Sequence, residues 1–191
     1  GYNTDAQGFL KALKEESGFD PKDNNVFVLG AGGAARAVVV ALAGAGASSL
    51  VVANRTLERA AAMIDSIQST LPSAGAIELR TDSLGLVAAN CHLIVNCTSL
   101  GMSGGEGQGE TPMTSDLIPS GALVCDLVYN PRETPLMHET AQAGAQVLGG
   151  LSMLVYQGAA AFGLWTDKEA PVKVMFEAAE KALAARQLIG S

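Results

Sequence analysis

With 191 residues, the chain has the length of one α/β domain, alone or with a small appendage. Its 48% hydrophobic and 16% charged residues indicate a large core and argue against disorder. The net charge of −7 argues against nucleic acid and anionic membranes as partners, because like charges repel. No apolar run reaches the roughly 18–20 residues that a bilayer-spanning helix needs.

The cysteines and histidines show no metal-binding or disulfide pattern. Cys91, Cys97 and Cys125 are odd in number and lie in or beside expected strands, which favours reduced core thiols of a cytoplasmic protein. The two histidines have no zinc-ligand spacing. We therefore expect a cytoplasmic protein without a metal site.

The chain begins with an expected helix over residues 6–17, in which Phe9, Leu10 and Leu13 form an apolar stripe. Thr4 or Asp5 is the expected N-cap, and capping alone would account for one of these two residues. Residues 18–25 form a turn-rich linker that leads into the first strand.

The next segment, VFVLGAGGAARA over residues 26–37, combines a strand, a glycine-rich turn and the start of a helix. The residues Val26–Leu29 fit a buried strand, and residues 34–45 are an apolar run of helical length. This order matches the dinucleotide-binding fingerprint, with Gly30, Gly32 and Ala35 in its three small-residue positions. The helix amides and the helix dipole attract a pyrophosphate. The predicted pyrophosphate contacts are Gly30, Ala31, Gly32, Gly33 and Ala34.

The second expected strand, Leu50–Ala53, ends where such domains usually carry an Asp or Glu for the ribose 2′-hydroxyl. This chain has Asn54, Arg55 and Thr56 there instead. A guanidinium can bind a 2′-phosphate through two hydrogen bonds, whereas a carboxylate would repel it. The sequence therefore predicts NADP rather than NAD, with Arg59 as a second cationic contact. The alternative is that Arg55 is a solvated loop charge and Thr56 a helix N-cap.

Strands and helices continue to alternate along the rest of the chain. The expected strands are 76–79, 92–96, 122–128 and 145–148; the expected helices are 57–71, 82–90, 134–143, 152–165 and 171–186. Residues 100–112 have no periodicity and are expected to form a mobile loop. The pattern predicts an α/β fold, a Rossmann-type doubly wound parallel sheet of six strands in the order 3-2-1-4-5-6, with extra C-terminal helices.

Several polar residues fall where such a sheet binds ligands, at the carboxyl ends of its strands. Thr98 and Ser99 follow the fourth strand, although spacing equally allows them to be turn-forming hydroxyls. Asp126 ends an apolar strand, and a structural partner is favoured for it over a catalytic role. Gln157 is the one amide in an apolar helix, so it is either satisfied locally or directed at a ligand.

Six motifs follow one another along the chain: Gly1–Asp5 followed by Gly8-Phe9, GAGGAARA (30–37), NRT (54–56), NCTSLGM (96–102), DLVYNPRETPL (126–136) and GGLSMLVYQGAAAF (149–162). Together and in this order they resemble the motifs of the shikimate dehydrogenase family. The resemblance covers the whole chain and implies the reversible reduction of 3-dehydroshikimate to shikimate by NADPH. The family carries a substrate domain of about 100 residues before the first motif. This chain resembles the family without that domain, so we expect it to bind NADP(H) with little or no turnover.

The resemblance also implies roles for individual residues. Asp5 matches the aspartate of a catalytic Lys–Asp pair whose lysine lies in the substrate domain. Tyr129 and Gln157 would reach the substrate together with Asp5, and Thr98 and Ser99 would lie along the cofactor. The residues that would border the nicotinamide are Leu127, Gly150 and Met153. One departure is Ser152, which stands where the family commonly has glycine.

The same resemblance divides the chain into three parts. Residues 1–18 would be a hinge helix and the end of the substrate domain, 19–150 the NADP-binding domain, and 151–191 helices that close against both domains. The expected partner is the small-molecule substrate, and no oligomeric state is predicted. Two alternatives stay open: a quinate/shikimate dehydrogenase that uses NAD, and a non-catalytic dinucleotide-binding module.

Overall fold

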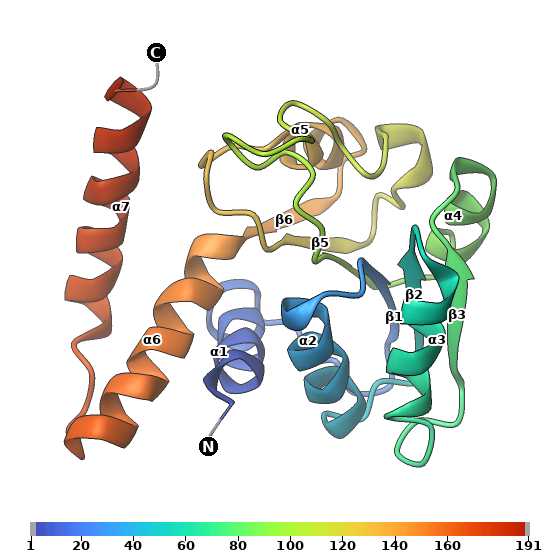
Figure 1. Cartoon of the computed structure of the whole chain (residues 1–191), viewed down its shortest axis with the longest axis horizontal. Coiled ribbons are helices and arrows are strands. Elements are labelled where there is room, and N and C mark those ends of the chain that lie inside the picture. Colours follow the sequence, from blue (N-terminus) through green and yellow to red (C-terminus); the bar gives the residue numbers. More distant parts are fainter. Residues whose placement is uncertain (1–2, 190–191) are drawn as a thin grey trace.

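A parallel sheet of six strands forms the centre of the computed structural model, which describes residues 3–189 (Figure 1). Its strands are β1 (Asn25–Leu29), β2 (Ser49–Asn54), β3 (Ala74–Glu78), β4 (Leu93–Asn96), β5 (Leu123–Asp126) and β6 (Gln146–Gly149). They lie in the order β3-β2-β1-β4-β5-β6. This order confirms the predicted Rossmann-type sheet. Strands β2 and β3 are added on one side of β1, and strands β4 to β6 on the other. Open α/β sheets bind ligands at such a switch point, here between β1 and β4.

Helices cover both faces of the sheet and extend beyond it. They are α1 (Thr4–Ala12), α2 (Gly33–Gly44), α3 (Leu57–Asp65), α4 (Thr81–Ala88), α5 (Pro135–Gln142), α6 (Gly150–Thr166) and α7 (Val172–Ile189), with a π-helical turn over Leu13–Ser17 and a 3₁₀ turn over Ser115–Leu117. In Figure 1, α1 lies between α2 and α6, and α7 lies beyond α6. None of the helices within residues 3–189 has both the length and the apolar character to cross a membrane.

Alternating side chains of the strands supply two apolar cores. Val26 and Val28 of β1 pack in the core that is shared with α1, α2 and α3. Phe27 and Leu29 point to the other face and pack with residues of α4 and α5. Because a strand buried on both faces needs apolar residues at every position, the unbroken run Val26–Leu29 is explained by this architecture.

The start of α1 differs from the prediction. Asn3 is its N-cap, and Asn3 Oδ1 accepts a hydrogen bond from the backbone N–H of Asp5 at 3.0 Å. The expectation that Thr4 or Asp5 caps the helix is therefore wrong, because both residues lie within its first turn. The Asp5 carboxylate is thus not used as a cap. Residues 1–2, which begin the first motif, and residues 190–191, which end the last predicted part, lie outside the described residues.

The helix expected over 57–71 and the strand expected over 122–128 are clearly longer than the observed elements. The helix expected over 57–71 ends at Asp65, and the chain continues in tighter turns. Ser66 Oγ donates to the carbonyl of Met63 at 2.6 Å, a local hydrogen bond that competes with the helical pattern. The strand expected over 122–128 ends at Asp126, because Val128 N donates to the Asp126 carboxylate at 3.1 Å instead of to a neighbouring strand.

Candidate functional site

The glycine-rich turn between β1 and α2 needs glycine at its first position. Gly30 has φ +101°, in the region that side chains disfavour, and its N–H donates to the carbonyl of Ala53 at 2.7 Å. A Cβ at Gly30 would lie 3.1 Å from the carbonyl carbon and oxygen of Cys97. By contrast, a Cβ at Gly32 or Gly33 would have no atom within 4 Å. The backbone at the start of α2 therefore has open space beside it, as an anion site at a helix N-terminus requires.

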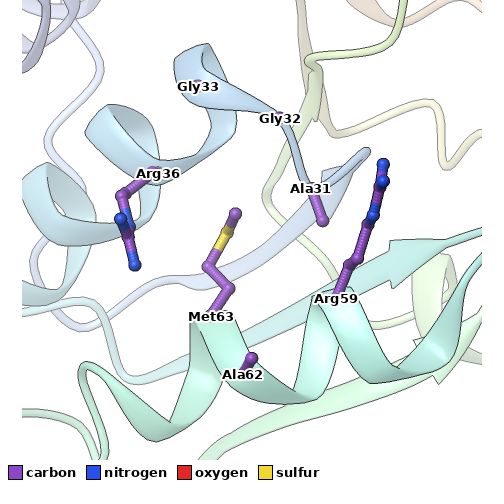
Figure 2. Close-up of a pocket in the computed structure, with 7 residues that line it drawn as sticks. All are labelled: Ala31, Gly32, Gly33, Arg36, Arg59, Ala62 and Met63. Atoms are coloured by element: carbon purple, nitrogen blue, oxygen red, sulfur yellow. The ribbon is translucent and has the colours of Figure 1, made fainter.

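Next to this turn, α2 and α3 enclose a hollow of about 390 Å³, which we name the arginine cavity (Figure 2). Its lining residues are Ala31, Gly32, Gly33, Arg36, Arg59, Ala62 and Met63. In Figure 2 the Arg36 side chain extends from α2 and the Arg59 side chain from α3, with Met63 between them. Two arginines and the positive end of α2 thus line one space, which favours an anion there.

Arg36 has no place in the sequence-based prediction, whereas Arg59 does. The signal that could have identified Arg36 is its position three residues after Gly33, on the first turn of α2. Helical periodicity places such a residue close to the helix start, near any anion that binds there. Its identity as an exposed arginine in a helix of small apolar residues would have completed that argument.

The turn between β2 and α3 carries the other residues predicted for the 2′-phosphate. Asn54 Nδ2 donates to the carbonyl of Thr56 at 2.9 Å, so this amide holds the turn. Thr56 is the N-cap residue of α3, as the alternative interpretation has it, although its side chain makes no capping hydrogen bond. Arg55 is exposed. Of the predicted phosphate contacts, Arg59 lines the arginine cavity and these three residues do not.

A second hollow of about 410 Å³, the central cavity, lies on the other side of the glycine-rich turn. Its walls are the residues that follow β4 and those that follow β5. The lining residues are Ala34, Cys97, Thr98, Ser99, Met102, Leu127, Val128, Tyr129 and Asn130. Thr98 Oγ1 donates to Asn96 Oδ1 at 2.7 Å and accepts from Leu100 N at 3.2 Å. Thr98 is therefore a turn-forming hydroxyl and also a wall of the cavity.

The third hollow, the Asp5 cavity, has a volume of about 250 Å³ and adjoins the central cavity through Ala34, Leu127 and Tyr129. Its lining residues are Asp5, Ala34, Leu127, Tyr129, Gly150, Met153, Leu154 and Gln157. All three predicted substrate residues and all three predicted nicotinamide neighbours thus meet in one place. They come from α1, from the loop after β5 and from α6, which are far apart in the sequence.

Two contacts shape the Asp5 cavity. A Cβ at Gly150 would overlap the backbone of Leu127, so α6 begins directly against the loop after β5. Gln157 Nε2 donates to the carbonyl of Leu154 at 3.0 Å. Gln157 is therefore satisfied locally through its amide nitrogen while it also lines the cavity, and the two interpretations of this residue are compatible.

Asp126 is fully buried beneath the central cavity and has the structural partners that were expected. Its carboxylate accepts hydrogen bonds from Asn96 Nδ2 at 2.9 Å, Val128 N at 3.1 Å and Thr134 Oγ1 at 2.6 Å. Burial raises the pKa of Asp126, and these three hydrogen bonds oppose that rise. The carboxylate does not line any of the three cavities.

The three cysteines are free thiols, and burial is the main cause that raises the pKa of each. The pKa of Cys91 is raised to about 11. The thiolate is the reactive form of cysteine, and a pKa two units above the usual 9.0 corresponds to about 100-fold less thiolate.

We expect the folded chain to react with Ellman's reagent at pH 8 at least about 100-fold more slowly than the urea-unfolded chain, which releases three equivalents. Absorbance at the wavelength of the released thiolate measures both rates. A folded-state thiol as fast as an unfolded one would contradict this expectation.

Comparisons with known proteins identify the family. A sequence model described as "Shikimate / quinate 5-dehydrogenase" matches residues 12–101, and one described as "Shikimate 5'-dehydrogenase C-terminal domain" matches residues 150–180. The NADP(+) shikimate dehydrogenase of Moorella thermoacetica is 47% identical over 186 residues, which are 97% of this chain and 62% of that protein. The chain belongs to the shikimate dehydrogenase family. It spans about three-fifths of the length of the curated relatives it matches.

Solved structures of the family share the fold. The shikimate 5-dehydrogenase of Listeria monocytogenes, in complex with shikimate and NAD, has a TM-score of 0.85 and 32% identity over 93% of this chain and 62% of its own. The enzyme of Thermus thermophilus, in complex with NADP(H) and shikimate, has a TM-score of 0.81 and 40% identity over 96% of this chain and 64% of its own. Members of the family therefore bind either dinucleotide.

Proposed function

We propose that this chain is the NADP-binding part of a shikimate dehydrogenase, which reversibly reduces 3-dehydroshikimate to shikimate with NADPH. The observation that carries the proposal is the Asp5 cavity, where the residues expected to hold nicotinamide and substrate converge beside the glycine-rich turn. Its polar lining comes from Asp5, Tyr129 and Gln157, and its apolar lining from residues such as Leu127 and Met153. An apolar pocket with a few convergent polar groups is the usual form of a small-molecule site.

The residues around the glycine-rich turn fit a dinucleotide. Gly30 brings the turn close to Cys97, and the open space over Gly32 and Gly33 leaves room for a pyrophosphate against the first amides of α2. The arginine cavity lies on one side of this point and the central cavity on the other. The adenosine half would occupy the arginine cavity, where two guanidinium groups favour NADP over NAD.

In the bound state the reduced nicotinamide supplies the hydride, and the chain's own residues prepare its acceptor. Tyr129 and Gln157 offer hydrogen bonds that orient the hydroxyl or carboxylate groups of the substrate. Hydride addition to a carbonyl builds negative charge on oxygen, so a proton donor must lie next to it. By the family resemblance, Asp5 would position the lysine that gives this proton. Lys11, Lys14 and Lys22 match no family motif, so that lysine would belong to the substrate domain.

The proposed division of the chain follows the same reasoning. Residues 1–18 are proposed as the hinge helix and the end of the substrate domain, 19–150 as the NADP-binding domain, and 151–191 as the helices that close against both. The packing of α1 on both α6 and α2 supports this division, because the first part then contacts the last part as well as the sheet domain.

Calorimetric titration tests the proposal. We expect NADP⁺ to bind, NAD⁺ to bind more weakly, and shikimate to give the NADP⁺-loaded chain little or no absorbance change at 340 nm. Failure of both dinucleotides to bind would overturn the proposal. Turnover in the usual enzyme range, about 1 to 1,000 per second, would contradict the need for a substrate domain. Tighter binding of NAD⁺ than of NADP⁺ would favour the NAD-dependent alternative.

A further inference from the structure

A chain of buried hydrogen bonds joins the ends of β4 and β5 to the start of α5. Asn96 and Asp126 are partners in the β4–β5 register, and Asn96 Nδ2 donates to Asp126 Oδ1 at 2.9 Å. Thr134 Oγ1 donates to Asp126 Oδ2 at 2.6 Å and accepts from Met137 N at 3.2 Å, where it caps α5. Asn96, Asp126 and Thr134 each have an exposed fraction of 0%. Buried polar groups are costly unless they are paired, and these three are paired with one another.

The same side chains hold the backbone of the two loops that wall the central cavity. Asn96 Oδ1 accepts hydrogen bonds from the backbone N–H and the hydroxyl of Thr98, at 3.0 and 2.7 Å. Asp126 Oδ1 accepts from the backbone N–H of Val128 at 3.1 Å. Thr98 belongs to the wall after β4 and Val128 to the wall after β5. Each wall is therefore hydrogen-bonded to the last residue of its own strand: Thr98 to Asn96, and Val128 to Asp126. Since Asn96 and Asp126 also pair with each other, one amide–carboxylate pair holds both walls.

The effect of this network is local to one half of the site. Asn96, Asp126 and Thr134 do not line the arginine, central or Asp5 cavity, so they act on a ligand only through the loops. The arginine cavity contains no residue of either loop. A change in the network should therefore move the walls of the central cavity and leave the arginine cavity intact.

We propose that Asn96, Asp126 and Thr134 are positioning residues that set the separation of the two loops and thereby the fit of the nicotinamide half of the cofactor. The inference rests on the proposed function, since it assigns that half to the central and Asp5 cavities. On this inference, three residues that touch neither cofactor nor substrate also determine how well the cofactor binds.

Thr134 offers the cleanest test because valine has nearly the shape and volume of threonine but lacks its hydroxyl. Thr134→Val removes the hydroxyl, so Asp126 Oδ2 loses its donor and the N–H of Met137 loses its acceptor. The carboxylate is then free to shift, and with it the loop amide of Val128 and the amide of Asn96. Thr134→Ser keeps the hydroxyl and so keeps both hydrogen bonds.

The experiment compares NADP⁺ with 2′,5′-ADP, which contains only the adenosine half, by calorimetry on the full chain. For Thr134→Val we expect the Kd of NADP⁺ to rise about 3- to 10-fold and that of 2′,5′-ADP to stay within about twofold, with Thr134→Ser close to the unaltered chain. An unchanged NADP⁺ affinity in Thr134→Val would overturn the inference. An equal loss for both ligands would also overturn it, because it would show general destabilisation. If the unaltered chain binds neither ligand, the proposed function fails first.

Amide exchange in the unaltered chain tests the same inference if Thr134→Val does not fold. We expect the amides of Thr98 and Val128 to exchange more slowly than those of Glu106 and Gly109, which lie in the exposed part of the loop after β4. NADP⁺ should slow exchange at Thr98 and Val128 further, whereas 2′,5′-ADP should not. Fast exchange at both amides, or equal effects of the two ligands, would overturn the inference.

Discussion

Replacing Arg59 with glutamine is expected to raise the Kd of NADP⁺ about 10- to 100-fold and to change that of NAD⁺ less than about threefold. Arg59 extends from α3 into the arginine cavity, where the 2′-phosphate of NADP⁺ would lie (Figure 2). Charge-assisted, two-pronged hydrogen bonds from a guanidinium to a phosphate contribute about 1.5–3 kcal/mol, and NAD⁺ has no group to receive them. Calorimetry measures both dissociation constants. The ionic strength must be the same in both titrations, because salt screens this interaction.

Arg80→Gln is the matched control for this substitution. Arg80 is also an exposed arginine, but it lies beside Glu78 and Asp82, at 3.8 and 3.6 Å, and does not line the cavity. The Arg80→Gln substitution should leave the Kd of NADP⁺ and the Kd of NAD⁺ unchanged. Arg36→Gln should resemble Arg59→Gln, because Arg36 reaches the same space from α2. Unchanged NADP⁺ binding in both cavity variants, with a loss in Arg55→Gln, would move the phosphate site to the turn after β2.

The sheet could be predicted because its determinants are local. Val26–Leu29, the glycine-rich turn and the following apolar run each carry their own pattern, and right-handed crossovers leave few possible strand orders. The observed order β3-β2-β1-β4-β5-β6 follows from those rules. Element ends were less predictable, since a single side-chain hydrogen bond can decide them. Ser66 at the end of α3, Asn3 at the start of α1 and Asp126 at the end of β5 are three examples.

The pairing of the two arginines in one cavity and the buried network depend on long-range contacts that local sequence patterns do not reveal. Arg36 is, by its sequence, an exposed helix charge, and only the approach of α2 to α3 brings it opposite Arg59. Asn96, Asp126 and Thr134 are separated by 30 and 8 residues. The register of β4 with β5 pairs Asn96 with Asp126, and Thr134 reaches Asp126 from the start of α5. Sequence spacing could indicate a structural partner for Asp126 but could not name it.

The packing of α1 on α6 is the clearest case of a long-range contact, and it depends on Gly8. A Cβ at Gly8 would lie 2.5–2.7 Å from the backbone N, Cα and Cβ of Gln157, so α1 and α6 touch at this point without space for a methyl group. Helix backbones can come this close only where a residue has no side chain. The contact places Asp5, one turn before Gly8, on the same cavity as Gln157.

Gly8→Ala is therefore expected to lower the free energy of unfolding by about 3 kcal/mol, and Tm by about 6–12 °C, because the overlap is with backbone that cannot rotate away. Urea titration and thermal unfolding measure the two quantities. Gly44→Ala is the matched control: Gly44 ends α2, is exposed, and a Cβ there would meet no atom within 4 Å. Alanine at that helical position should stabilise the chain by about 0.5–1 kcal/mol. If Gly8→Ala were as stable as the unaltered chain, α1 and α6 would have to be able to separate without loss, and the Gly8–Gln157 contact would not be what keeps Asp5 at the same cavity as Gln157.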